Sequence, residues 1–415
     1  PLEIRSKSIW HRKVRKVIVP QKKWTRIEKL RKATPGPQFR GNLLDFQREG
    51  LDFLLKSYGN ALLADEMGLG KCTVHDSLIM TLNGQITIKE IWDKAVTIEK
   101  DGTEEWGKLE TPVKVQTFDG EKIITKQVSH VFRQKIDENI VRITLSDGSA
   151  IECTKRHRVL TPDGWRMAGK LSVDERIAVP SKTLHEGKNS LTPNVAELIA
   201  WQMAEGWEFF RENGKPLGRF TNSDPKVLSR LRKLAKQEGI ELSKPYPRSN
   251  KTSYDITTTK LYELFLKWGY EWGKKSKGKI VPMAILEAPL ETQKAFVQAI
   301  FDAEGHVGKT YCELSTASKS IAFALREILF HFGIWLRIRI AKKYATNGSR
   351  IRRKYYICTF GGNSVQRFHE QFKLLITYKQ IALEKLAQKK HNTNIEGVPS
   401  QKIVQKIAES GISLR

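Results

Sequence analysis

Two helical segments in the C-terminal half of the chain end in the same tripeptide, Ala-Glu-Gly. One spans Asn194–Gly206 and the other Thr292–Gly305, so their acids, Glu205 and Glu304, are 99 residues apart. A similar order of strand, helix and basic strands follows each segment. This repetition indicates two copies of one structural unit, and the small alanines would let the two helix ends approach closely, with one acid from each.

The spacing of hydrophobic residues changes along the chain and divides it into three parts. A length of 415 residues also suggests several domains, because domains usually hold roughly 100–200 residues each. Residues 1–71 combine a basic segment with a helix and a buried strand. Residues 72–188 are rich in Asp-Gly turns and in short strands, which we predict at Val141–Thr144, Ala150–Cys153 and Arg158–Thr161. After the polar connector Ser181–Ser190, Thr192 and Pro193 begin a helical region that includes residues 189–415. We expect a multidomain protein with an α/β fragment, an all-β domain, and an α+β domain with an internal pseudo-repeat.

The charge balance predicts a polyanionic partner. Lys and Arg total 72 against 45 Asp and Glu, a net charge of +27, which favours nucleic acid. No apolar run is long enough to span a membrane, and Pro1–Pro20 is too rich in Arg and Lys for a secretory signal. The chain has no Cys-x-x-Cys pair, which predicts reduced thiols and a cytoplasmic location without a membrane partner; the four cysteines are Cys72, Cys153, Cys312 and Cys358.

A glycine-containing turn follows the short apolar run Ala61–Ala64 and ends in Gly70-Lys71. A buried strand before such a turn is the layout of a phosphate-binding loop, whose backbone N–H groups and lysine surround nucleotide phosphates. The pattern requires Ser or Thr after the lysine to reach Mg²⁺, but this chain has Cys72. The ATP-binding pattern therefore stops at Lys71.

The segments Leu44–Gly50 and Ala64–Lys71 resemble the N-terminal edge of the ATPase core in Swi/Snf-type helicases of superfamily two. The resemblance implies α/β P-loop architecture and an ATP site formed by Gln47, Gly68, Gly70 and Lys71. No Asp-Glu-x-His box follows, so we expect an interrupted ATPase that hydrolyses no ATP in this form. An active DNA-dependent ATP translocase is the alternative.

A leading Cys72, the segment Gly148–His157 and the exit Asp174–Pro180 resemble the N-terminal splicing blocks of inteins, which have the Hint fold. The Cys72 thiol can attack the carbonyl of Lys71, producing a thioester. His157 is suited to protonate the leaving nitrogen, and Thr154 to orient the amide or stabilise the oxyanion. A Hedgehog-like autoprocessing domain shares this chemistry but does not carry twin helices.

The triplet His391-Asn392-Thr393 has the residue types of a downstream splice junction. No β-rich C-terminal splicing block precedes it, so we interpret it as part of the endonuclease-like region. On this interpretation the C-terminal splicing strands lie beyond Arg415, and the chain holds the N-terminal part of a Hint domain over residues 72–188.

The paired Ala-Glu-Gly ends resemble the signature helices of single-chain LAGLIDADG homing endonucleases, over roughly residues 190–405. The resemblance implies that Glu205 and Glu304 hold Mg²⁺ and that Lys279 and Lys379 assist the water or the transition-state charge during cleavage of double-stranded DNA. It also implies a monomer with a pseudo-two-fold axis, whose target is the intein-free allele of the host gene.

Two alternatives remain for this region. The Ala-Glu-Gly ends could be simple helix C-caps, and the lysines could be solvated or contact phosphates. A DNA-binding module without catalysis is then possible. In either case the basic strands would enter the major groove, which admits a β-ribbon; these segments are Arg219–Asn222, Lys244–Thr257, Arg337–Tyr344 and Arg350–Thr359.

Overall fold

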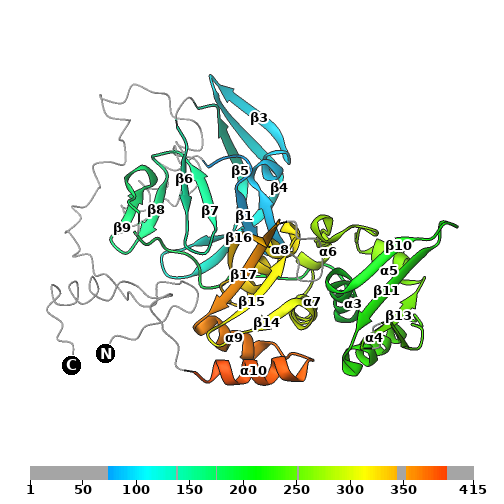
Figure 1. Ribbon diagram of the computed structural model, residues 1–415. Coiled ribbons are helices and arrows are strands. Elements are labelled where there is room, and N and C mark those ends of the chain that lie inside the picture. The colour runs from blue at the N-terminus through cyan, green and yellow to red at the C-terminus, as the bar shows by residue number, and fades with distance from the viewer. Residues whose placement is uncertain (1–72, 137–138, 174, 250–251, 344–351, 390–415) are drawn as a thin grey trace, which may run out of the picture.

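The computed structural model describes residues 73–389 except 137–138, 174, 250–251 and 344–351. A β-rich part leads into a larger part built of helices and sheets (Figure 1). No helix among these residues is both long and apolar enough to cross a membrane. Cys153, Cys312 and Cys358 are buried, free thiols.

The described residues of the β-rich part form nine strands. The main sheet has the order β2-β1-β4-β3, with β5 also paired to β4, and two hairpins, β6-β7 and β8-β9, lie apart from it. A short helix, α2 (Ile88–Trp92), and a 3-10 turn, η2 (Ala168–Lys170), complete it. The strands are β1 (Leu78–Thr81), β2 (Gly84–Thr87), β3 (Ala95–Asp101), β4 (Glu104–Phe118), β5 (Ile123–Gln134), β6 (Val141–Thr144), β7 (Ala150–Cys153), β8 (Arg158–Thr161) and β9 (Gly164–Met167).

Two of the hairpins turn at the Asp-Gly pairs that the sequence marks. Gly148 has a φ of +84° and Gly164 a φ of +99°, in the left-handed region that glycine adopts without a steric penalty. These turns set the register, pairing Val141 with Cys153 and Arg158 with Met167.

The C-terminal part contains the same succession of elements twice. The first copy comprises α3 (Pro193–Ala204), β10 (Gly206–Phe210), β11 (Pro216–Asn222), α4 (Pro225–Gln237), β12 (Tyr246–Pro247), β13 (Tyr254–Thr258) and α5 (Leu261–Lys267). The turn η3 (Ser276–Gly278) and α6 (Met283–Leu286) connect it to the second copy. That copy comprises α7 (Leu290–Glu304), β14 (Gly305–Val307), β15 (Tyr311–Thr316), α8 (Lys319–His331), β16 (Arg337–Lys343), β17 (Arg353–Gly361), α9 (Asn363–Gln371) and α10 (Thr377–Ala387).

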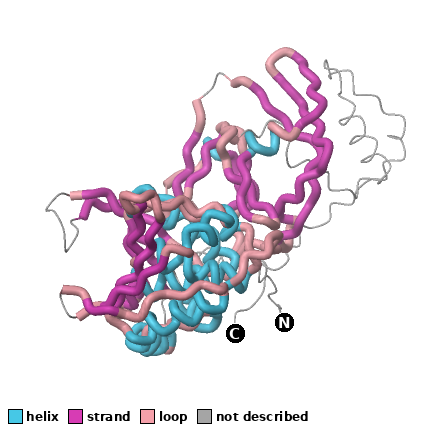
Figure 2. The backbone as a smooth tube through the Cα atoms, turned by 90° about the vertical axis from the view of Figure 1, so that its right-hand side faces the viewer, coloured by secondary structure: helices cyan, strands magenta, loops and turns pink. Residues whose placement is uncertain are grey.

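The strand orders of the two sheets confirm the internal repeat. One sheet is ordered β10-β11-β13-β12 and the other β14-β15-β17-β16, which is the same arrangement in each copy. The strands of these two sheets lie to one side of the repeat helices (Figure 2). Helices α3 and α7 pack against each other, and one apolar cluster extends from Leu191 to Leu386 across both copies. The two copies therefore share a single core.

The first repeat helix begins as the sequence predicts. The Thr192 side chain accepts a hydrogen bond from the backbone N–H of Val195 at 3.3 Å, and Pro193 occupies the first turn. This cap satisfies one backbone donor that a helix N-terminus otherwise leaves unpaired.

The connector 181–190 joins the two parts and lies against the second copy. The Thr183 N–H donates to the Phe330 carbonyl at 3.4 Å, and the Lys188 N–H to the Glu287 carbonyl at 3.0 Å. A side chain at Gly187 would lie 2.2 Å from the Pro289 nitrogen. The connector is thus packed closely on the helical part.

Candidate functional sites

The segment Thr154–His157 forms a tight turn directly after β7. The His157 N–H donates to the Thr154 carbonyl at 3.1 Å, and the Ala168 N–H donates to the His157 carbonyl at 2.6 Å. Thr154 is only 2% exposed, and within the described part of the chain its hydroxyl has no hydrogen-bond partner. A buried hydroxyl of this kind is costly unless it serves a group that binds there.

The start of the described chain lies beside this turn. Thr73 pairs with Cys153 as an antiparallel bridge, and the Val74 N–H donates to the Glu152 carbonyl at 3.1 Å. Cys72 lies outside the described residues, as do Gln47, Gly68, Gly70 and Lys71, so their predicted roles stay predictions.

The two predicted acids stand at equivalent places, at the ends of α3 and α7. The pKa of Glu205 is raised to about 7, mainly by burial and also by the charge of Glu304, against the lowering effect of the Asn222 hydrogen bond and of Lys379. Burial also raises the pKa of Glu304, against the charges of Lys379 and Lys279. The structure thus brings the four predicted residues close enough for their charges to interact; they are Glu205, Glu304, Lys279 and Lys379.

Each predicted lysine is buried and binds the end of one repeat helix. Lys279 Nζ donates to the carbonyls of Gln202 at 2.9 Å and Met203 at 3.0 Å. Lys379 Nζ donates to the carbonyls of Asp302 and, at 3.4 Å, Phe301. The ammonium groups satisfy carbonyls that the helix leaves unpaired and oppose the negative end of its dipole. The interpretation of these lysines as solvated is wrong, because they are 7% and 6% exposed.

The glycines of the tripeptides do not act as left-handed C-caps. Gly305 has an extended backbone with φ −76° and ψ 146°, and neither it nor Gly206 has a positive φ. A Cβ at Gly305 would lie 2.4 Å from the Phe301 carbonyl oxygen, and one at Gly206 would lie 2.5 Å from the Gln202 carbonyl oxygen. Close approach to the preceding helical turn therefore requires glycine, and Gly305 still serves as a C-cap of extended conformation, because its N–H donates to the Phe301 carbonyl.

The sequence does not lead us to predict three further polar residues of this site. Asn222 donates to Glu205 from β11. Buried Glu208 accepts from Gln202 Nε2 at 3.1 Å and from the Tyr270 hydroxyl at 2.9 Å. Asp302 accepts the N–H groups of Leu375 and Ile376, and its charge acts on Lys379. Only Glu208 carries a sequence signal, an acid within an otherwise aromatic strand.

A cation at this site would need ligands from outside the protein. The described residues contain no group of three or more His, Cys, Asp or Glu side chains that could hold a metal ion. The charge of Glu304 nevertheless acts on Glu205, and two such carboxylates repel each other unless a proton or cation lies near them. The donor set of Glu205 and Glu304 fits a hard cation whose other ligands are water and phosphate oxygens.

Three of the predicted DNA-binding segments coincide largely with β11, β16 and β17, whereas Lys244–Thr257, predicted as one strand, contains among its described residues only the short β12 and most of β13. In the second sheet, Arg337 and Arg339 of β16 are exposed, and Ile338 between them is buried. Alternation along a strand puts the two arginines on the face away from the core. Residues 344–351, which end one predicted segment and begin the next, lie outside the described residues.

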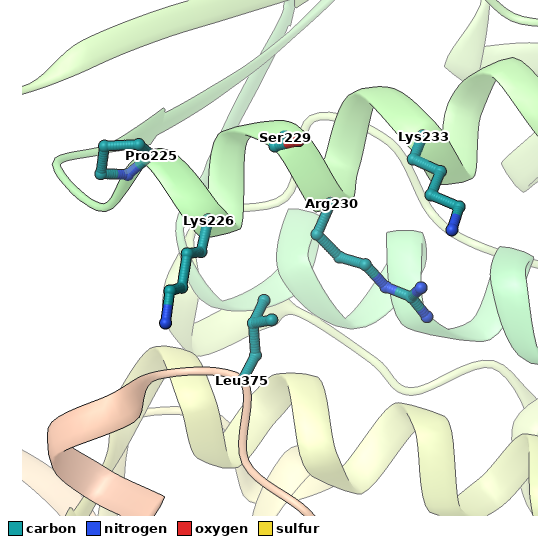
Figure 3. Close-up of a pocket in the computed structure, with 6 residues that line it drawn as sticks. All are labelled: Pro225, Lys226, Ser229, Arg230, Lys233 and Leu375. Atoms are coloured by element: carbon teal, nitrogen blue, oxygen red, sulfur yellow. The ribbon is translucent and has the colours of Figure 1, made fainter.

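A shallow depression on α4 is lined by none of the predicted site residues (Figure 3). Two of its three basic side chains already have partners, since Lys226 Nζ donates to Thr377 Oγ1 at 2.6 Å and Arg230 binds Glu197 with two hydrogen bonds. We do not consider it an active site. The lining residues are Pro225, Lys226, Ser229, Arg230, Lys233 and Leu375.

Comparison with known proteins gives relatives of several kinds. An A-type ATP synthase protein from Pyrococcus horikoshii is 26% identical over 308 residues, which make up 69% of this chain and 31% of that relative. The chain therefore spans about a third of the length of this relative. Among solved structures, I-DmoI in complex with DNA and calcium is 13% identical, with a TM-score of 0.32, over 43% of this chain and 87% of that one. The TvoVMA intein is 23% identical, with a TM-score of 0.24, over 26% of this chain and 69% of that one.

The family comparison covers most of the sequence. The model of the intein splicing domain matches residues 78–410, a range that includes both the β-rich part and the two repeats. It contains the turn Thr154–His157 as well as Glu205 and Glu304. This protein belongs to the intein splicing domain family.

Proposed function

We propose that the chain is an intein inserted after Lys71 of a Swi/Snf-type helicase, and that it combines self-splicing at Cys72 with site-specific cleavage of double-stranded DNA. The observation that carries the endonuclease assignment is the pair of acids at the ends of α3 and α7, each beside a buried lysine. The Thr154–His157 turn beside Thr73 supports the splicing assignment.

The first splicing step requires Cys72 near Thr154 and His157. Consecutive Cα atoms are about 3.8 Å apart, so Cys72 must lie within this distance of Thr73, which pairs with the residue before Thr154. The Cys72 thiol loses its proton to solvent and its sulfur attacks the Lys71 carbonyl carbon, the C–N bond breaks, and His157 protonates the released nitrogen. The product is a thioester of Lys71, and the Thr154 hydroxyl has no competing partner within the described residues that would keep it from the reacting amide.

The splicing proposal is tested with protein expressed from the complete gene. A thiol reagent should release residues 1–71, and Cys72→Ala should abolish this release because no thioester can form. His157→Ala should slow it by about 10²–10⁴, the usual contribution of general acid–base catalysis. His130→Ala, at an exposed position on β5, serves as the matched control. Unchanged release in Cys72→Ala would refute the assignment.

The endonuclease proposal assigns opposite tasks to acids and lysines. Glu205 and Glu304 would hold Mg²⁺, which when bound would neutralise phosphate charge and activate the attacking water. Lys279 and Lys379 hold the helix ends that carry these acids and keep positive charge beside them. Burial lowers the pKa of both lysines, whereas the neighbouring acids raise it. The lysines would therefore position the acids and stabilise the anionic transition state.

Cleavage of a duplex that carries the uninterrupted host site, across the Gly70-Lys71 codons, tests this proposal. Glu205→Gln and Glu304→Gln should bind that duplex but lose double-strand cleavage, because the amide keeps the shape without the charge. Glu197→Gln is a matched control, since this acid on the same helix pairs with Arg230. Cleavage in both site variants would show that the helix ends are structural, and binding without cleavage by the native chain would favour an inactive DNA-binding module.

The host assignment rests on residues 1–71 alone, which lie outside the described residues. If Lys71 belongs to an interrupted ATP site, the chain should show no ATP hydrolysis, whereas the spliced host should hydrolyse ATP in a DNA-dependent manner. DNA-stimulated hydrolysis by the unspliced chain, lost in Lys71→Ala, would instead favour an active translocase.

A further inference from the structure

A polar network covers the open face of the first sheet. Trp207, Arg219, Thr221 and Asp255 lie on one face by register, because Trp207 pairs with Arg219 and Thr221 pairs with Asp255. The opposite face carries Phe220 and Ile256, which are 1% and 0% exposed. The network therefore lies on the face that points away from the core.

Two neighbours, Trp207 and Asp255, hold the Arg219 guanidinium group. Its Cζ lies 4.0 Å from the centre of the Trp207 ring, a stacked cation–π arrangement. Its Nη1 is 3.4 Å from Asp255 Oδ2, and Asp255 also accepts from the Thr221 hydroxyl at 2.6 Å. Asp255 further attracts Arg248, whose Nε is 3.9 Å from Oδ2. One carboxylate with a side-chain exposure of 5% thus fixes the arginine in place.

Most donors of Arg219 remain available. Arginine has five N–H donors, and the ion pair with Asp255 engages one nitrogen. Its Nε is buried and therefore closed to an external base, whereas no hydrogen bond or ion pair within the described residues engages Nη2. An arginine with a fixed plane and free donors matches the N7 and O6 acceptors of guanine in the major groove.

We propose that Arg219, oriented by Trp207 and Asp255, is a specificity-determining residue that reads a guanine in the half-site bound by the first repeat. The inference rests on the proposed DNA-cleaving function. Trp207 follows Glu205 by two residues, so the network lies next to one acid of the cleavage site. The target is a duplex with guanine at the position that faces Arg219.

The second sheet carries a different set at the equivalent places. Pairing of Gly206 with Phe220 and of Gly305 with Leu314 aligns the repeats, so Glu313 corresponds to Arg219. Glu313 lies 3.5 Å from the Lys343 ammonium. Ile357 corresponds to Asp255, because it pairs with Ser315 as Asp255 pairs with Thr221. The arginine-reading network is absent from the described part of the second sheet, so the two half-sites must differ.

The experiment selects bound duplexes from a library built on the uninterrupted host site, with blocks of positions randomised, using the full chain without Mg²⁺. The native chain should select guanine at one position of one half-site. Arg219→Gln should change that preference to adenine, the base that glutamine reads, with about a tenfold to hundredfold loss on the guanine site. Arg339→Gln, on the second sheet, should leave this position unchanged.

Two further variants separate reading from folding. Asp255→Asn should weaken the guanine preference without replacing it by adenine, because the anchor loses its charge. Trp207→Leu should also weaken the guanine preference. Because Trp207 is 52% exposed, this variant provides the test if Arg219→Gln does not fold. Identical base preferences in the native chain and all three variants would overturn the proposal. The proposal would also be overturned if Arg219→Gln kept the native base preferences and lowered the slope of log binding constant against log salt concentration by about one unit. That result indicates a phosphate contact.

The proposed function can fail separately. A native chain that neither selects a sequence nor cleaves the host site with Mg²⁺ contradicts the endonuclease assignment itself. A native chain that cleaves this site but shows no guanine preference in either half overturns only the assignment of Arg219.

Discussion

Gly206 and Gly305 determine, at the scale of single residues, whether the repeat helices can end beside their acids. A Cβ at Gly305 would lie 2.4 Å from a backbone oxygen, which cannot move aside as a flexible side chain would. We expect Gly305→Ala to lower the free energy of unfolding by about 1–3 kcal/mol, the usual cost of overpacking. Gly278→Ala is the control, because a Cβ there meets no atom within 4 Å. Denaturant unfolding would compare them, and equal losses would contradict this explanation.

The same scale shows what the sequence can predict of the site. The repeated tripeptide identifies Glu205 and Glu304 because it encodes both the acid and the glycine that its position requires. Asn222 and Asp302 could not be predicted in the same way, since their partners come from strands or loops that only the folded chain brings near. The burial of Lys279 is likewise a tertiary property, because its carbonyl partners are more than 70 residues away.

At the scale of elements, a stacked histidine pair holds the connector on α8. His185 and His331 have ring centres 4.3 Å apart, and Gln293 accepts from His331 Nδ1 at 2.9 Å. Burial, together with a smaller effect of the neighbouring His185, lowers the pKa of His331 to about 3. The unfolded residue has a pKa near 6.5, so between about pH 6.5 and 3 only the unfolded chain binds this proton. Stability is therefore full above about pH 6.5 and falls as the pH decreases through that window.

Replacing His331 should flatten this dependence. His331→Asn keeps a donor near the place of Nδ1 but cannot titrate, so its stability should change less between about pH 7 and pH 5 than that of the native chain. The full effect is at most on the order of 5 kcal/mol across the window. Urea unfolding at several pH values would measure it, with His130→Asn as an exposed control. If the stability of His331→Asn falls with decreasing pH as steeply as that of the native chain, the histidine pair does not cause the pH dependence of stability.

Element boundaries illustrate why local signals succeed where tertiary ones fail. The predicted strands Val141–Thr144, Ala150–Cys153 and Arg158–Thr161 agree with the structure, because glycines with positive φ define the turns beside them. The predicted helix Asn194–Gly206 is observed as Pro193–Ala204, ending before a glycine that begins a strand. No local pattern, however, shows that both repeats share one core.

At the scale of the whole molecule, the β-rich part contacts the second repeat through a hairpin turn. The Ile338 N–H at the start of β16 donates to the Asp147 carbonyl at 3.0 Å. The Gln85 N–H also donates to a carboxylate oxygen of Glu327 at 3.1 Å. Since Arg337 and Arg339 flank Ile338, the β-rich part supports a predicted DNA-binding strand at the edge of its sheet. Separating these parts should therefore disturb the second sheet more than the first.

Gly148 and Gly164 allow this contact to be tested without altering any predicted catalytic residue. Both follow Asp in a hairpin turn with positive φ, so alanine at either should cost about 1–2 kcal/mol of left-handed strain. A Cβ at Gly148 would also lie 2.4 Å from the Ile338 carbonyl oxygen, whereas one at Gly164 meets nothing within 4 Å. Gly148→Ala should therefore separate the two parts, giving two calorimetric transitions and faster proteolysis within the connector 181–190. Gly164→Ala should lose stability without these changes, and identical behaviour of the two variants would show that the hairpin contact does not couple the halves.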